Sequence, residues 1–161
     1  MKPFKLAISV TITGTFLFAA GAFADPKPRN ASVTGGQALA ALYGGKTQIW
    51  KKCQGGIYYG PRWEAQAYCA QHPNSVGVGT WRIDGKGRVC QNLTWYWSVD
   101  GQLTSKEGEE ECISHLTAED GIVWRSWPKD REWWKATNSA SLEKGFKLKS
   151  KIRRLRKKLK V

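Results

Sequence analysis

Four cysteines are the side chains with the most definite chemistry in this 161-residue sequence: Cys53, Cys69, Cys90 and Cys112. A cysteine thiol pairs in a disulfide, binds a metal ion or acts as a nucleophile. An even number of cysteines in an exported chain is typical of a disulfide framework, and four cysteines allow three connectivities. We therefore predict two disulfides, and the positions of the cysteines by themselves leave the pairing open.

A metal site is the alternative use of these thiols. Cys112 and His115 have the Cys-x-x-His spacing found in zinc sites, and one more cysteine would add a third ligand. Such a site needs reduced thiolates, which an oxidising compartment does not favour. We predict no metal ion and no cofactor.

Few residues suggest catalysis. The chain has two histidines, His72 and His115, and none of the His-Glu-x-x-His, Gly-x-Ser-x-Gly or glycine-rich phosphate-loop motifs. Ser114 and His115 are neighbours on a predicted strand, where adjacent side chains point to opposite faces, so they form no dyad. An acidic run could supply paired carboxylates or a weak Ca²⁺ site, but such runs are more typical of a solvated loop: Glu107, Glu109, Glu110 and Glu111.

Nine tryptophans are too many for a domain of this size to bury completely. Large rings on neighbouring strands fill the core of a small β protein, which accounts for most of them. Trp127, Trp133 and Trp134 flank a predicted turn and are expected to stay exposed, where they would offer a stacking platform for sugar rings or acyl chains. His115 joins this candidate ligand site, with a hydrogen-bonded position at the edge of the core as the alternative.

The C-terminal segment combines an apolar stripe with dense positive charge. Leu148, Ile152, Leu155 and Leu159 recur at spacings that place them on one face of a helix. Basic side chains fill the other faces: Lys149, Lys151, Arg153, Arg154, Arg156, Lys157, Lys158 and Lys160. We expect this helix to fold on an anionic surface that neutralises its charge. The alternative is a helix docked on the domain by its apolar stripe, with its charges solvated or facing the glutamates.

The net charge of +13 is unevenly distributed along the chain. Residues 142–161 hold ten Lys or Arg and one Glu, whereas residues 25–141 are nearly balanced. An electrostatic partner is therefore expected at the C-terminal segment. An anionic membrane surface, lipopolysaccharide or acidic polysaccharide would suit it, and nucleic acid is not expected in the compartment predicted below.

The elements that must position these residues are mostly short strands. Residues 36–43 have helical spacing, Thr34 is a candidate N-cap and Gly44-Gly45 a stop. From Thr47 onward the pattern alternates with a period of two. It predicts strands at 47–53, 57–59, 62–69, 77–83, 88–99, 112–117, 122–127 and 132–137, with an acidic loop at 104–111. We predict a mainly β fold, an antiparallel meander of seven or eight short strands in a small barrel or two-layer sheet, with a helix near each end. Residues 88–99 should be its central strand.

The N-terminus has the layout of a cleaved secretory signal. Lys2 and Lys5 precede a short apolar run, and Ala22-Phe23-Ala24 provides a cleavage site. We divide the chain into a signal peptide at 1–24, a flexible lead-in at 25–35, a disulfide-stapled β domain at 36–141 and a basic tail at 142–161. A periplasmic or secreted location follows from the signal and the cysteines.

Several of these positions together resemble the exported bacterial family known as domain of unknown function 995, over about residues 38–150. The matching positions are Leu42-Tyr43, Thr47 with Trp50, Gly56, Tyr58, Gly79-x-Trp81, Gly87-Arg88-x-Cys90 with Trp95, Cys112 with His115, Trp133-Trp134 and Leu142-Glu143-Lys144-Gly145. The family is found mainly in alphaproteobacteria, so the resemblance implies a periplasmic protein, and it brings no activity with it.

The resemblance also bears on the disulfides. Cys90 and Cys112 can face each other if residues 88–99 and 112–117 are neighbouring strands, and the resemblance favours this pair, which leaves Cys53 with Cys69. We expect a non-catalytic periplasmic binding or envelope-associated protein. The alternative is an enzyme or enzyme inhibitor acting on cell-envelope glycans.

Overall fold

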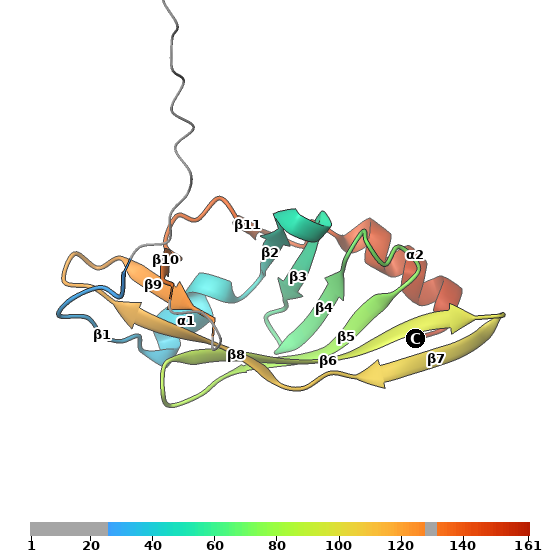
Figure 1. Cartoon of the computed structure of the whole chain (residues 1–161), viewed down its shortest axis with the longest axis horizontal. Coiled ribbons are helices and arrows are strands. Elements are labelled where there is room, and N and C mark those ends of the chain that lie inside the picture. The colour runs from blue at the N-terminus through green and yellow to red at the C-terminus, as the bar shows by residue number, and fades with distance from the viewer. Residues whose placement is uncertain (1–25, 128–131) are drawn as a thin grey trace, which may run out of the picture.

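A computed structural model of the protein describes residues 26–127 and 132–161 (Figure 1). The predicted signal peptide lies outside the described residues. Among the helices in the described part of the chain, none has the length and apolar character needed to cross a membrane.

The strands form one antiparallel sheet that curls into a half-barrel (Figure 1). Its main path runs β10-β9-β8-β6-β5-β4-β3-β2-β11, while β1 pairs with β8 and β7 with β6. The strands are β1 (Ser32–Val33), β2 (Lys46–Trp50), β3 (Gly55–Tyr59), β4 (Glu64–Tyr68), β5 (Val76–Ile83), β6 (Arg88–Val99), β7 (Gln102–Glu107), β8 (Glu111–Thr117), β9 (Val123–Ser126), β10 (Trp134–Lys135) and β11 (Leu142–Lys144). The prediction of a mainly β antiparallel fold is confirmed.

Strand β6 is the central strand, with the bounds that the sequence predicted. It pairs with β5 along one edge, and its other edge is shared by β8 at residues 88–91 and β7 at residues 94–99. Thr94 faces Glu107 and Gln91 faces Glu111, so the β7–β8 side has one extra residue and forms a bulge. The predicted acidic loop at 104–111 is therefore wrong for its first half, which is strand β7.

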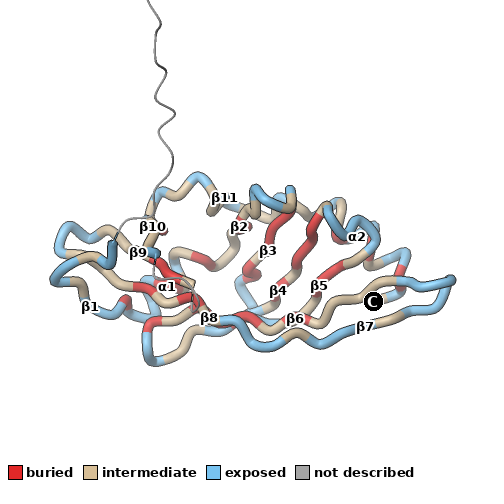
Figure 2. The backbone as a smooth tube through the Cα atoms, viewed as in Figure 1, coloured by how far each residue is buried: buried red, intermediate tan, exposed pale blue. Residues whose placement is uncertain are grey.

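The inner face of the sheet holds one core, closed by helix α1 (Gly36–Tyr43). Leu39 and Tyr43 of α1 are fully buried, and the Tyr43 ring meets the Tyr59 ring edge-on with centroids 5.1 Å apart. Ala65 and Ala67 on β4 make room for these rings because their side chains are small. The red segments of Figure 2 show where buried residues occur, at α1 and along several strands of the sheet.

The ends of α1 differ in part from the prediction. The N-cap is Gly35, whose position offers no side-chain cap, while Thr34 is buried and its hydroxyl bonds that of Thr117 at 2.9 Å. At the other end Gly44 donates to the Ala40 carbonyl, and Gly45 has a φ of +72°, which glycine adopts without strain. The predicted glycine stop is confirmed, and Thr34 instead ties the lead-in to the sheet.

The outer face carries a second core under helix α2 (Lys149–Leu159). Ile152, Leu155 and Leu159 pack there with Tyr68 and Val76. The short helix η1 (Lys51–Cys53) links β2 to β3. Because β11 pairs with β2 and α2 covers the sheet, residues 142–161 belong to the same folded unit as the β domain and are not a separate tail.

Candidate functional site

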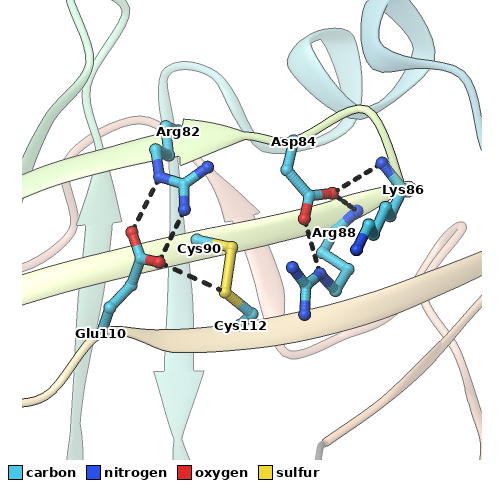
Figure 3. Close-up of a disulfide and its surroundings, with 7 residues drawn as sticks. All are labelled: Arg82, Asp84, Lys86, Arg88, Cys90, Glu110 and Cys112. Carbon is cyan, nitrogen blue, oxygen red and sulfur yellow. Dashed lines mark hydrogen bonds and ion pairs between the residues drawn. A yellow bond between two sulfur atoms is a disulfide. The ribbon is translucent and has the colours of Figure 1, made fainter.

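Cys90 and Cys112 form a disulfide between β6 and β8, with 22 residues between them in sequence (Figure 3). They are register partners, so the bridge joins directly opposed residues. This pairing is confirmed. Arg82 on β5 is the register partner of Cys90. Its guanidinium donates two hydrogen bonds, of 2.8 and 2.6 Å, to the Glu110 carboxylate, and Figure 3 shows this ion pair beside the sulfur atoms. Because both its side chains are well exposed, solvent screens the ion pair and it adds little to stability.

The second predicted disulfide is absent from the structure. Cys53, half-buried in η1, and Cys69, buried at the end of β4, are both free thiols. They are nonetheless neighbours, because the Ala70 amide donates to the Cys53 carbonyl at 2.8 Å. Burial, followed by a hydrogen bond and repulsion from the Cys69 thiol, raises the pKa of Cys53 to about 11. The prediction that Cys53 pairs with Cys69 was therefore right about their proximity and wrong about a disulfide between them.

His115 lies in the core and does not face a ligand site. It is 1% exposed, and a hydrogen bond of 2.7 Å joins its Nε2 to the Tyr43 hydroxyl. Burial, with the positive charge of Arg125 as a second cause, lowers its pKa to about 4. A zinc site with Cys112 does not assemble either, since that sulfur belongs to the disulfide. The alternative of a hydrogen-bonded core histidine is the correct one.

The three candidate tryptophans are all half-buried, so none is the fully exposed ring that the sequence predicted. Trp127 lines a cavity beside β6, β7 and β8. Trp134 sits on β10 opposite Arg125 of β9, and Trp133 precedes it. Residues 128–131 of the predicted turn lie outside the described residues.

The acidic run is spread along the β7–β8 junction. Glu107 ends β7, Glu111 begins β8 and accepts a hydrogen bond from Gln91, and Glu110 pairs with Arg82. In the described residues, potential metal-ligand atoms gather in threes only at Cys90, Glu110 and Cys112, where the disulfide occupies both sulfurs. The acidic run therefore has a structural role in the strands on either side of the bulge.

Helix α2 is docked on the sheet, as the alternative prediction had it. Its apolar stripe is buried against β4, β5 and β6 rather than free for an external surface. Deleting one buried leucine typically costs about 2–5 kcal/mol, so the docking is worth more than the charge repulsion within one helix. The expectation that α2 folds only on binding is wrong.

The cationic face of α2 points to solvent. Lys151 lies 4.9 Å from the centre of the Tyr68 ring, and Arg156 donates to the Val161 carbonyl, so these two are held against the domain. The others are exposed: Lys149, Arg153, Arg154, Lys157, Lys158 and Lys160. Among residues 26–127 and 132–161, no carboxylate pairs with any basic side chain of α2.

A feature that the sequence reasoning missed is a cavity of about 730 Å³ lined by Trp50, Trp95 and Trp97. These tryptophans belong to the larger set that the sequence predicts to fill the core. Gly77 is the register partner of Trp95, and a Cβ there would lie 3.3 Å from the indole, so this glycine allows the ring to pack closely on β5. Cys53 and Cys69 line the same cavity.

Comparison with known proteins gives one match. The model of the family described as "Protein of unknown function (DUF995)" matches residues 9–153, nearly the whole chain. No curated protein matches the chain. No solved structure matches it either.

Proposed function

The chain belongs to this family, and we propose that it is a non-catalytic, envelope-associated binding protein of the periplasm whose helix α2 contacts an anionic surface. The observation that carries the proposal is the exposed cationic face of a docked helix. Charges such as Arg153, Arg154 and Lys157 are held side by side on a rigid element without an acidic partner among the described residues. A preformed array of cations attracts anionic head groups without a folding cost.

Docking of α2 limits how it can bind. Since Ile152, Leu155 and Leu159 are buried in the domain, they do not insert between lipid chains. The contact is therefore electrostatic and peripheral, and it weakens steeply as salt screens the charges. The partner class is the one expected from the sequence: anionic phospholipid, lipopolysaccharide or acidic polysaccharide.

A periplasmic setting is supported by two features. The first 24 residues have the layout of an export signal, and the Cys90–Cys112 bridge is of the kind that forms in an oxidising compartment. The alternative of an enzyme acting on glycans has no comparable support, because His115 is buried in the core and holds Tyr43.

The test removes charge without disturbing the buried stripe. Arg153, Arg154, Lys157 and Lys158 are all changed to Gln, and binding to vesicles containing phosphatidylglycerol is measured by sedimentation at several salt concentrations. Each basic side chain near an anionic surface contributes about 1 kcal/mol, so the variant should bind roughly two to three orders of magnitude more weakly. Immobilised lipopolysaccharide and polygalacturonate in parallel assays identify the preferred source of anionic groups.

The matched control changes four exposed lysines outside α2 to Gln: Lys51, Lys52, Lys86 and Lys106. It carries the same loss of net charge and should keep most of the affinity. Equal weakening in both variants would show a general effect of net charge and reject a specific α2 surface. Binding that is insensitive to salt would also reject it.

A further inference from the structure

The tryptophan-lined cavity has no part in the function proposed for α2. It is lined by Trp50 at the end of β2 and by Trp95 and Trp97 on β6. The loop of residues 71–75 that follows β4 also lines it. The volume of about 730 Å³ lies within the range of sites that bind small molecules. We propose that this cavity binds a ring of an uncharged oligosaccharide.

The lining chemistry matches a sugar ring. A pyranose has an apolar face of C–H groups and an edge of hydroxyls, so it needs flat aromatic surfaces next to hydrogen-bonding groups. The three half-buried indoles supply the surfaces. Asn74, Ser75 and Ser98 line the same cavity and supply amide and hydroxyl groups. A lipid chain would instead need an apolar lining without these polar groups.

The charge of the lining selects an uncharged ligand. None of its residues is Lys, Arg, Asp or Glu, and His72 is its one basic side chain, so a charged group entering the cavity would lose hydration with little ionic compensation. Trp95 also lines the neighbouring cavity, where Glu107 and Glu111 lie, so acidic sugars would be repelled there. This ligand therefore differs from the polyanion proposed for α2, and the two sites are independent.

The neighbouring cavity indicates a ligand longer than one ring. It has a volume of about 800 Å³, and its lining includes Trp95, which it shares with the first cavity, and Trp127. An oligosaccharide stacked in the first cavity has room to continue across Trp95. Trp127, one of the tryptophans selected from the sequence, then belongs to the second half of this site.

The positions of the indoles are held by the fold. Trp50 and Trp95 pack against the inner core, and Gly77 leaves the space in which the Trp95 ring lies. A site built on packed strands is ordered before the ligand arrives, which reduces the entropy lost on binding. Trp97 is half-buried and belongs to neither of the two cores. Of the three indoles that line the cavity, it is therefore the one whose removal should disturb folding least.

The experiment titrates the full mature chain with uncharged oligosaccharides by calorimetry. The probes are N-acetylchitotetraose, cellotetraose and maltotetraose, with the corresponding monosaccharides. We expect at least one tetrasaccharide to bind more tightly than its monosaccharide, and Trp97→Ala to weaken that binding by at least about tenfold, as for a central aromatic contact. Asn74→Ala, in an exposed loop outside the cores, should weaken it as well.

Trp63→Ala is the matched control, because Trp63 is 47% exposed and lies outside this cavity. It should leave the affinity unchanged. The proposal is overturned if no uncharged oligosaccharide binds, or if Trp97→Ala, shown to be folded by its circular dichroism and melting, keeps wild-type affinity. Preferential binding of an acyl chain or of polygalacturonate in the cavity would overturn it too.

Discussion

His115 illustrates how a residue with catalytic potential can be used for structure. Its imidazole bonds Tyr43 and shares the buried space between α1, β8 and β9 with Arg125. Charging it there would place two positive groups side by side in the core. Its role is therefore to be a neutral hydrogen-bonding partner of the helix that closes the half-barrel.

This burial predicts a pH dependence of stability. The pKa of His115 is about 4 in the folded protein and near 6.5 when unfolded, so between these values the unfolded chain binds the extra proton. The stability present above pH 6.5 is lost as pH falls towards 4, by up to about 3 kcal/mol. Urea unfolding at pH 7 and pH 4.5 should show this loss, and His115→Gln should reduce it. An unchanged pH dependence in the variant would contradict this account.

The free thiols give a second prediction at the scale of residues. Denatured protein should react with two equivalents of a thiol reagent and yield Cys90 linked to Cys112 in a peptide map. In the native protein Cys53 should react before Cys69, because it is the less buried thiol. Its reaction rate should increase as the pH is raised towards its pKa of about 11, because the thiolate is the reactive form. A count of zero thiols would show that Cys53 and Cys69 are oxidised in solution.

Helix α2 shows two properties within one element. Its stripe residues are buried in the outer core and its basic residues face solvent. Stability and surface charge can therefore be changed separately, which is the basis of the charge variant proposed above.

Leu155→Ala should lower the free energy of unfolding by about 2–5 kcal/mol, because Leu155 is 5% exposed and packs in the outer core. Chemical denaturation measures this change. Arg154→Ala on the exposed face is the matched control and should change stability by less than about 0.5 kcal/mol. Similar losses in both variants would mean that α2 is not anchored by its stripe.

The turn between β5 and β6 is an element-scale feature that the sequence located correctly. Asp84 accepts hydrogen bonds from the amides of Lys86 and Arg88, each 2.9 Å long, and pairs with the Arg88 side chain at 2.6 Å (Figure 3). Burial opposes ionisation of Asp84, but the bonds from Arg88 and Lys86 outweigh it and lower its pKa.

Asp84→Ala should cost about 1–2 kcal/mol, since it leaves these two amides without their acceptor. Glu119→Ala in the exposed turn between β8 and β9 is the control, and denaturation of both variants makes the comparison. A larger loss for Glu119→Ala would show that the side-chain bonds of Asp84 do not explain its effect.

At the scale of the whole molecule, the two helices occupy opposite faces of one curled sheet. α1 fills the inner face and α2 covers part of the outer face (Figure 1). Each is the cover for a set of apolar residues that would otherwise meet water. Residues 142–161, which the sequence divided off as a basic tail, thus pack on the same sheet through β11 and α2.

A chain that ends at Ser141 should therefore fail to fold cooperatively. It lacks β11 and α2, so it exposes the edge of β2 and leaves Tyr68 and Val76 uncovered. Thermal melting followed by near-ultraviolet circular dichroism is the measurement, with a chain that lacks residues 26–30 as a truncation control. A sharp melting transition of the shortened chain near that of the full protein would contradict the prediction.

The sequence by itself determined the local pattern. Alternation placed β6 at residues 88–99, helical spacing placed α1 at residues 36–43, and the mixed stripe predicted the helix of α2. These features follow from the period of apolar residues, which is a property of neighbours along the chain. The prediction of strands at 47–53, 62–69 and 132–137 was too long because pairing partners, and not the pattern, decide where a strand ends.

Only the tertiary structure decided which surfaces meet. The spacing of apolar residues predicts the face of the strand or helix on which Trp95 or Leu155 lies. It does not predict that Trp95 lines a cavity with Trp50, or that the helix of Leu155 covers β4 and β5. Those contacts join segments far apart in sequence, and they depend on strand order and on the curl of the sheet. The predictions of a Cys53–Cys69 disulfide, of a ligand site at His115 and of an undocked α2 failed for the same reason.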